Sequence, residues 1–149
     1  MDQNGKKKFR TYRDLIVWQK SMKLVARVYA LAREMPRDEQ YGLAAEIRRS
    51  AFSIPSSIAE GYGRRVSEEY RRLLGAAIGF SFALETQLLL AAELDLVPGI
   101  QLDEVSEELS GIARMLKSLI SKISQRESGT APEAGRPVPA ATGNRNFSS

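Results

Sequence analysis

Serine hydroxyls are the first side chains in this sequence that could act chemically, and they recur at helical spacing. With the glycine that follows them, the series is Ser50, Ser53, Ser57 and Gly61. A serine nucleophile needs an activating base, but the chain has no histidine, no cysteine, and no lysine between Lys23 and Lys117. We therefore interpret this series as small positions that let helices approach closely. We interpret a second series in the same way: Gly75, Gly79 and Ala83.

Carboxylates are the second group with catalytic or metal-binding potential. The candidates are Glu46, Glu60 and Glu85. Di-metal four-helix proteins use a Glu-x-x-His motif, which a chain without histidine cannot supply. We expect Glu60 and Glu85 to form structural ion pairs with Arg48, Arg49 or Arg64, and we expect no metal, no cofactor and no enzymatic activity. The weaker alternative is a hydrolase that works with carboxylates and Mg²⁺.

Basic side chains form two clusters suited to a polyanion. The clusters are Lys6, Lys7, Lys8 and Arg10, and then Arg64, Arg65, Arg71 and Arg72. The net charge is only +4, yet the stretch from Leu73 to Ile112 contains seven acidic residues and no basic one. The distribution of charge, more than its total, therefore favours contacts to RNA or DNA phosphates.

Four helical segments must position these side chains, because apolar residues recur at spacings of three and four in four stretches. The expected starts lie near Asp14, Asp38, Ser67 and Asp103. Thr11 and Asp14 predict a capping box, and Pro55 predicts a kink in the second helix. The expected apolar seam of the first helix is Leu15, Trp18, Met22, Val25, Tyr29 and Ala32. The pattern predicts an all-α fold, an antiparallel up-down-up-down four-helix bundle.

The two ends of the chain differ in composition from the helical part. We expect residues 1–10 to form a flexible basic arm, residues 11–125 the bundle, and residues 126–149 a disordered tail rich in Pro, Gly, Ser and Ala. The first residues lack the apolar core of a secretory signal, so we expect a cytoplasmic location.

The third helix carries more apolar residues than one buried stripe requires. This surplus predicts a homo-oligomer with an interface at Leu74, Ile78, Phe80, Phe82 and Leu89. A membrane span is disfavoured because Glu85 falls inside the apolar stretch.

The second helix also carries a recognisable motif. The segment EIRRSAFSIPSSIAEGYGRR, from Glu46 to Arg65, resembles the signature of the bacterial proteins encoded in 23S rRNA intervening sequences. The similarity extends over roughly Phe9 to Ser124. The chain has Glu46 and Ser57 where the family commonly has glutamine and asparagine, and Gly79-Phe80-Ser81-Phe82-Ala83 where it usually has Gly-Ser-x-x-Glu.

The resemblance implies an antiparallel four-helix bundle that assembles as a homopentamer without enzymatic activity. Related accessory proteins of diversity-generating retroelements bind nucleic acid and a reverse transcriptase, so the resemblance also implies such partners. Together, residues and resemblance predict an oligomeric accessory protein that associates with RNA or DNA through one basic end. The alternative is a protein–protein interaction adaptor that does not bind nucleic acid.

Overall fold

The computed structural model describes residues 11–64 and 66–128, which form helices joined by short connections and contain no strand. The four long helices are α1 (Ile16–Arg33), α2 (Leu43–Tyr62), α3 (Ser67–Glu93) and α4 (Gly99–Glu127). Two single turns of 3₁₀ helix precede α1 and α2: η1 (Tyr12–Asp14) and η2 (Arg37–Glu39). The described chain is therefore the all-α, four-helix protein that the periodicity predicts.

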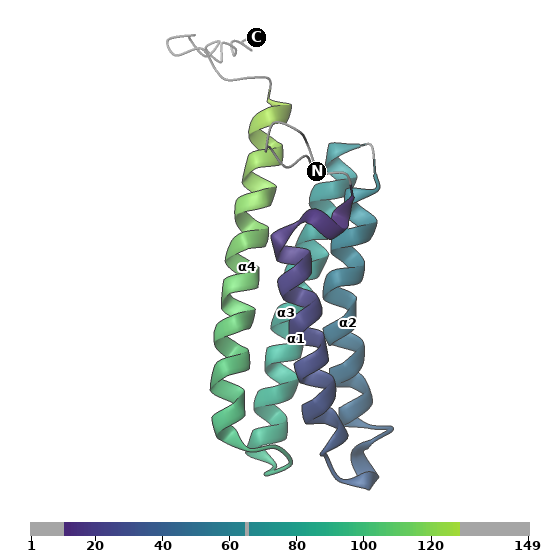
Figure 1. Ribbon diagram of the computed structural model, residues 1–149, viewed down its shortest axis with the longest axis vertical. Coiled ribbons are helices and arrows are strands. Elements are labelled where there is room, and N and C mark those ends of the chain that lie inside the picture. The colour runs from purple at the N-terminus through teal and green to yellow at the C-terminus, as the bar shows by residue number, and fades with distance from the viewer. Residues whose placement is uncertain (1–10, 65, 129–149) are drawn as a thin grey trace, which may run out of the picture.

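Successive helices run up and down the long axis of the molecule, so their connections alternate between its two ends (Figure 1). Each helix lies beside two neighbours, in the pairs α1–α2, α2–α3, α3–α4 and α1–α4, and no diagonal pair of the described helices comes as close along its backbone. The pair α1–α4 is the most loosely packed of the four. An ion pair between Arg71, near the start of α3, and Glu127, at the end of α4, agrees with this arrangement.

The core consists of aliphatic side chains from all four helices. Its largest fully buried members include Leu24, Ile47, Ile54, Ile58, Leu74, Leu84, Leu88, Ile112 and Leu116. Burying one such side chain contributes roughly 1.5–3 kcal/mol, so packing rather than helix propensity holds the bundle together.

The expected apolar seam of α1 is partly wrong. Met22, at the centre of that seam, is 45% exposed, and the helix instead buries Val17, Leu24 and Val28. Ser21 obscured this pattern, because it is a polar residue in the core. Its hydroxyl donates to the carbonyl of Trp18 at 2.8 Å, which removes the cost of burying it.

Several local signals act at or near their expected positions. Thr11 accepts a hydrogen bond from the backbone of Arg13, and its own backbone N–H donates to Asp14, but this capping box caps η1 rather than α1. The fourth helix begins at Gly99, one turn before its expected start. Pro55 is buried within α2, which continues without interruption from Leu43 to Tyr62, and the kink stays a prediction.

The two series of small residues have different roles. A side chain at Gly61 would meet Tyr70 at 3.0 Å and Leu73 at 3.1 Å, so this glycine permits the close approach of α2 to α3. At Gly75 and Gly79, a methyl group would have no atom of the described chain within 4 Å beyond its own helical turn. Interpreting these two glycines as helix-packing positions is therefore wrong within the single chain, since they face open space.

We predict that Gly61→Ala lowers the free energy of unfolding by about 1–3 kcal/mol, because the added methyl overpacks the α2–α3 contact. The matched variant Gly111→Ala should instead raise it by up to about 1 kcal/mol, since its nearest neighbour is a flexible arginine end at 3.8 Å. Denaturant titration measures both changes. Equal effects at the two positions would contradict the close contact at Gly61.

Candidate nucleic-acid interface

Three separate parts of the chain meet at one end of the bundle: the start of α1, the α2–α3 connection and the end of α4 (Figure 1). We call this the basic end. Its described cations are Arg13, Arg64, Arg71, Arg72, Lys117, Lys122 and Arg126. The candidate residues Lys6, Lys7, Lys8, Arg10 and Arg65 lie outside the described residues.

The predicted cluster on the α2–α3 connection is largely neutralised by neighbouring carboxylates. Arg71 pairs with Glu127 of α4, and Arg72 pairs with Glu69 at 3.1 Å. Arg64 lies 3.3 Å from Glu60, which confirms the expected structural ion pair of that carboxylate. These contacts are partly or well exposed, and such pairs contribute at most about 1 kcal/mol, so an incoming phosphate can replace them at little cost.

Four other cations at the basic end have no carboxylate partner among the described residues. They are Arg13, Lys117, Lys122 and Arg126, and all four side chains are exposed. The cations of α4 are spread over ten residues. The up-and-down order expected from the sequence predicts that they meet Arg13, because α4 must end where α1 begins.

Two tyrosines lie between the arginines of the α2–α3 connection and the core. The rings of Tyr62 and Tyr70 meet edge to face with their centroids 6.1 Å apart. Burial raises the pKa of Tyr70 to about 12, and the nearby Tyr62 adds to the effect. Tyr70 therefore keeps its proton to a higher pH than a free tyrosine, and its ring packs against the core at this end of the bundle.

A groove runs between α1 and α4, where helix packing is loosest. Its section at the basic end has a volume of about 590 Å³, an apolar floor that includes Ile16 and Leu119, and a rim formed by Arg114, Lys122 and Arg126. A second section of about 740 Å³ shares Arg114 and Met115 with the first. We call the two sections together the α1–α4 groove.

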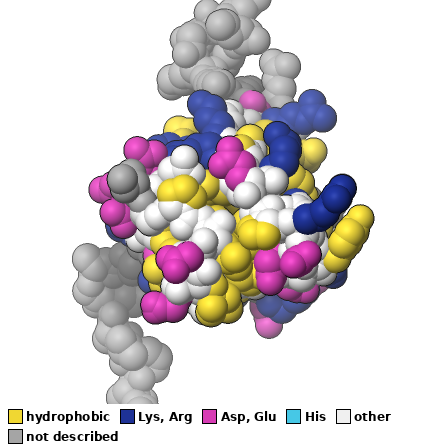
Figure 2. All heavy atoms as spheres, turned by 90° about the horizontal axis from the view of Figure 1, so that it is seen from below, with side chains coloured by type: hydrophobic (Ala, Val, Ile, Leu, Met, Phe, Trp, Pro, Cys, Tyr) yellow, Lys and Arg dark blue, Asp and Glu magenta, His cyan; other side chains and the backbone are white. Residues whose placement is uncertain are grey.

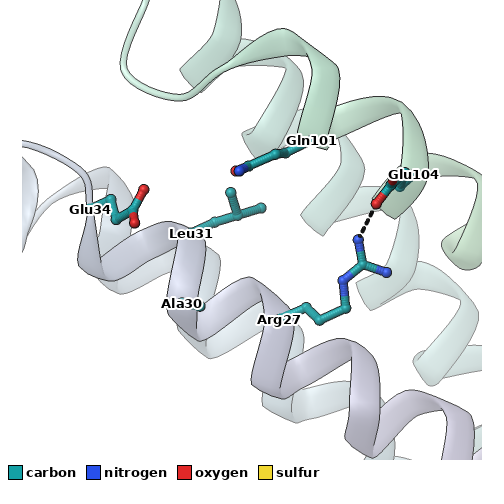
Figure 3. Close-up of a pocket in the computed structure, with 6 residues that line it drawn as sticks. All are labelled: Arg27, Ala30, Leu31, Glu34, Gln101 and Glu104. Atoms are coloured by element: carbon teal, nitrogen blue, oxygen red, sulfur yellow. Dashed lines mark hydrogen bonds and ion pairs between the residues drawn. The ribbon is translucent and has the colours of Figure 1, made fainter.

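The opposite end of the bundle is different in charge. Figure 2 shows acidic side chains in scattered groups on this end, with apolar side chains between them and basic side chains along part of the outline. Near it, Arg27 of α1 lies 2.9 Å from Glu104 of α4 (Figure 3). Arg27 also pairs with Glu108, so two ion pairs tie α1 to α4. The small pocket beside this ion pair is lined by Leu31, Glu34 and Gln101, among others. Among the described residues that line this pocket, the one cation is Arg27, and it is already paired with glutamates. The pocket therefore offers no free positive charge to a phosphate.

The remaining carboxylates form no obvious reaction centre. Within residues 11–64 and 66–128, no group of three or more acidic side chains is placed to hold a metal ion. Glu85 is half-buried on α3, and its expected pairing with Arg48 or Arg49 is not among the ion pairs of the described chain. Arg48 instead donates to the backbone carbonyl of Gln40 at 2.8 Å.

The structure divides the predicted interface residues of α3 into two groups. Leu74 is fully buried in the core, so its assignment to an interface between subunits is wrong, because its side chain is already covered by the other helices. Phe82 and Leu89 are each 53% exposed and Phe80 is 36% exposed, while Ile78 is partly buried.

By length and composition alone, α3 is also long and apolar enough to cross a membrane, with a third of its most apolar window buried.

Comparison with known proteins identifies the family. The profile of the 23S rRNA-intervening sequence protein family matches residues 13–118. The fold is similar to the crystal structure of a protein of unknown function from the S23 ribosomal protein family of Bacteroides thetaiotaomicron VPI-5482. That similarity has a TM-score of 0.67 at 20% sequence identity and covers 71% of this chain and 96% of the other. No curated protein matches the chain significantly. The chain belongs to the 23S rRNA-intervening sequence protein family.

The raised pKa of Tyr70 predicts a pH dependence of stability. Between pH 10 and 12 the unfolded chain loses the Tyr70 proton while the folded chain keeps it, so the free energy of unfolding falls as the pH rises. Denaturant titrations across this range should show a shallower fall for Tyr70→Phe than for the wild type. Tyr41→Phe, at a site that is 96% exposed, is the matched control and should keep the wild-type slope. Identical slopes for all three proteins would contradict a buried Tyr70 hydroxyl.

Proposed function

We propose that this member of the 23S rRNA-intervening sequence family is a non-enzymatic, oligomeric accessory protein that binds RNA or DNA phosphates at its basic end. One observation carries the proposal. Arg13 of η1 and Lys117, Lys122 and Arg126 of α4 are exposed, lie at the same end, and have no carboxylate partner in the described chain. Such a surface attracts a polyanion, and each phosphate bound releases condensed counterions.

Two arginines of the basic end that are paired with carboxylates support binding in a second way. The ion pairs of Arg64 and Arg72 join residues four and three apart on exposed surface, with side chains 47% and 63% exposed. Weak pairs of this kind hold the guanidinium groups in place without satisfying all their donors. A phosphate that displaces Glu60 or Glu69 therefore gains a positioned arginine.

The site favours backbone contacts over base recognition. The described aromatic pairs at this end, Tyr62 with Tyr70 and Tyr12 with Trp18, each meet edge to face, which leaves no pair of parallel faces for stacked bases among these rings. Lysines and arginines that contact phosphates carry no sequence information. The proposal therefore predicts binding that depends strongly on salt and weakly on sequence.

Assembly would multiply this binding. One subunit offers a handful of phosphate contacts, and a ring of subunits would repeat them around one face, so several weak contacts act together at high effective concentration. The family resemblance suggests five copies. The alternative function, a protein–protein interaction adaptor, needs no basic surface that binds phosphates. It predicts that the charge of the basic end can be reversed without loss of function.

The test is a charge reversal outside the α1–α4 groove. The triple variant Arg13→Glu, Arg64→Glu and Lys117→Glu should weaken binding to a fluorescent RNA or DNA oligonucleotide at least tenfold at low salt. It should also make the slope of log K against log salt shallower by about two, since each lost phosphate contact removes about 0.7–0.9. Fluorescence anisotropy over a salt series measures both quantities.

The matched control carries the same change in charge elsewhere. Arg33, Arg37 and Arg49 are exposed and lie away from the basic end, and their reversal to glutamate should leave the slope unchanged and the affinity within about threefold. If the control weakens binding as much as the test variant, the basic end is not the site. No binding by the wild type at low salt would reject the proposal.

A further inference from the structure

The proposed function leaves the floor of the α1–α4 groove unused. This floor is apolar and is built by both helices: Leu15, Ile16 and Val17 at the start of α1, and Met115, Leu119 and Ile123 on α4. Ile16 is 56% exposed, so the floor is open to a ligand. Phosphates gain nothing from apolar side chains, whereas a ligand with an apolar surface gains free energy by covering them. The floor therefore favours a ligand that is partly apolar.

The rim of the groove is basic along much of its length. It carries five exposed cations: Lys20 and Lys23 on α1, and Arg114, Lys122 and Arg126 on α4. None of the five is ion-paired to a carboxylate of the described residues. The three cations of α4 span about 18 Å at the rise of an α-helix. A ligand with one anionic group could meet only one or two of these cations, so the rim matches several negative charges spread along a ligand.

Ion pairs mark where this basic stretch ends. In the groove section farther from the basic end, Arg27 of α1 is paired with Glu104 of α4 (Figure 3) and with Glu108. These pairs tie the two helices together and leave no free cation at Arg27. The stretch that can attract an anionic ligand therefore lies between this tie and Arg126.

A third helix has the shape that fits a groove between two helices, because helices pack side by side at interaxial distances of about 8–10 Å. About twelve residues of helix span the 18 Å of the basic stretch. Apolar residues at helical spacing would cover the floor. Acidic residues on both sides of that apolar face would meet Lys20 and Lys23 on one side of the groove and Arg114 and Lys122 on the other.

We propose that the α1–α4 groove binds an acidic amphipathic helix of another protein, with its apolar face on the floor and its carboxylates against the cations of the rim. This partner goes beyond the proposed phosphate binding and does not depend on it. An occupied groove would cover Lys122 and Arg126, two of the four cations that carry the proposed function. A protein with such a helix would therefore compete with RNA or DNA for part of the basic end.

A synthetic peptide tests whether the groove has this preference. The probe is a fluorescent peptide of about 18 residues, or five helical turns, with leucines along one face, glutamates on both sides of them and alanines elsewhere. Fluorescence anisotropy should show saturable binding to the full chain. A permuted peptide of the same composition, with its leucines spread around the helix, should bind at least tenfold more weakly. Equal binding of the two peptides, or no binding of the first, would overturn the inference.

A substitution in the floor tests the apolar contact. Ile16→Asp should weaken peptide binding at least tenfold, and the dipole of α1 favours an acidic residue in this first turn, so the variant should fold. Phe52→Asp, at a site on α2 that is 45% exposed, is the matched control and should stay within about threefold of the wild type. Circular dichroism checks both folds. Unchanged peptide affinity of folded Ile16→Asp would contradict the proposal, and so would an equal loss of oligonucleotide binding, which would place nucleic acid on the floor.

Charge reversal tests the rim. The double variant Lys20→Glu and Arg114→Glu should weaken peptide binding at least tenfold, because both changes place a negative charge beside the bound glutamates. The double variant Arg33→Glu and Arg49→Glu carries the same change in net charge at exposed sites outside the groove. At physiological salt, where charges are screened beyond about 8 Å, it should stay within about threefold of the wild type. Equal losses in the two double variants would reject the groove as the site.

Covalent labelling locates the bound peptide, since the chain has no natural cysteine. A thiol-reactive group on the peptide should label Ser118→Cys, which lines the groove, and should leave Ser56→Cys, exposed on α2, unmodified. Dodecanoate, which has one carboxylate, should displace the peptide only at about a hundredfold excess or more. Equal labelling of the two cysteines, or displacement at equal concentration, would overturn the inference. A wild type that binds the peptide but no oligonucleotide would reject phosphate binding and support the acidic helix alone.

Discussion

The apolar surface on almost every side of α3 is the constraint on which the rest of the structure depends. One side buries Leu74, Leu84 and Leu88 among the other helices, and the described bundle has no further helix to cover the opposite side, where Phe82 and Leu89 are exposed. A four-helix bundle buries only the inward-facing side of such a helix. The other side stays uncovered within the described chain, and the assembly in the proposed function would cover it.

The order of the helices then decides where charge collects. Because the connections alternate between the two ends, the start of α1, the α2–α3 connection and the end of α4 share one end (Figure 1). Helix dipoles favour basic residues in the last turns of α4, so part of this charge also stabilises the helix. The same residues therefore serve stability and, in the proposed function, phosphate binding. A ring of parallel subunits would place every such end on one face.

The periodicity of the sequence predicted the four helices well, and its failures have physical causes. On α4 every buried position is apolar, including Val105, Ile112 and Leu116, so the spacing of apolar residues alone identifies its buried face. On α1 the hydroxyl of Ser21 donates a hydrogen bond to the carbonyl of Trp18, which allows this polar residue to lie in the core. A search for apolar residues alone therefore missed the buried face of α1. The ion pair of Arg71 with Glu127 joins residues far apart in sequence and could not be predicted from spacing.

The most direct test of the central claim maps where nucleic acid touches the protein. Ultraviolet cross-linking of the assembled protein to a short labelled oligonucleotide, followed by peptide mass spectrometry, locates the contacts without any mutation. The account predicts cross-linked peptides from the start of α1, from the segment between Tyr62 and Arg72, and from the last turns of α4. Cross-links confined to the opposite end, around η2 and the α3–α4 connection, would contradict it.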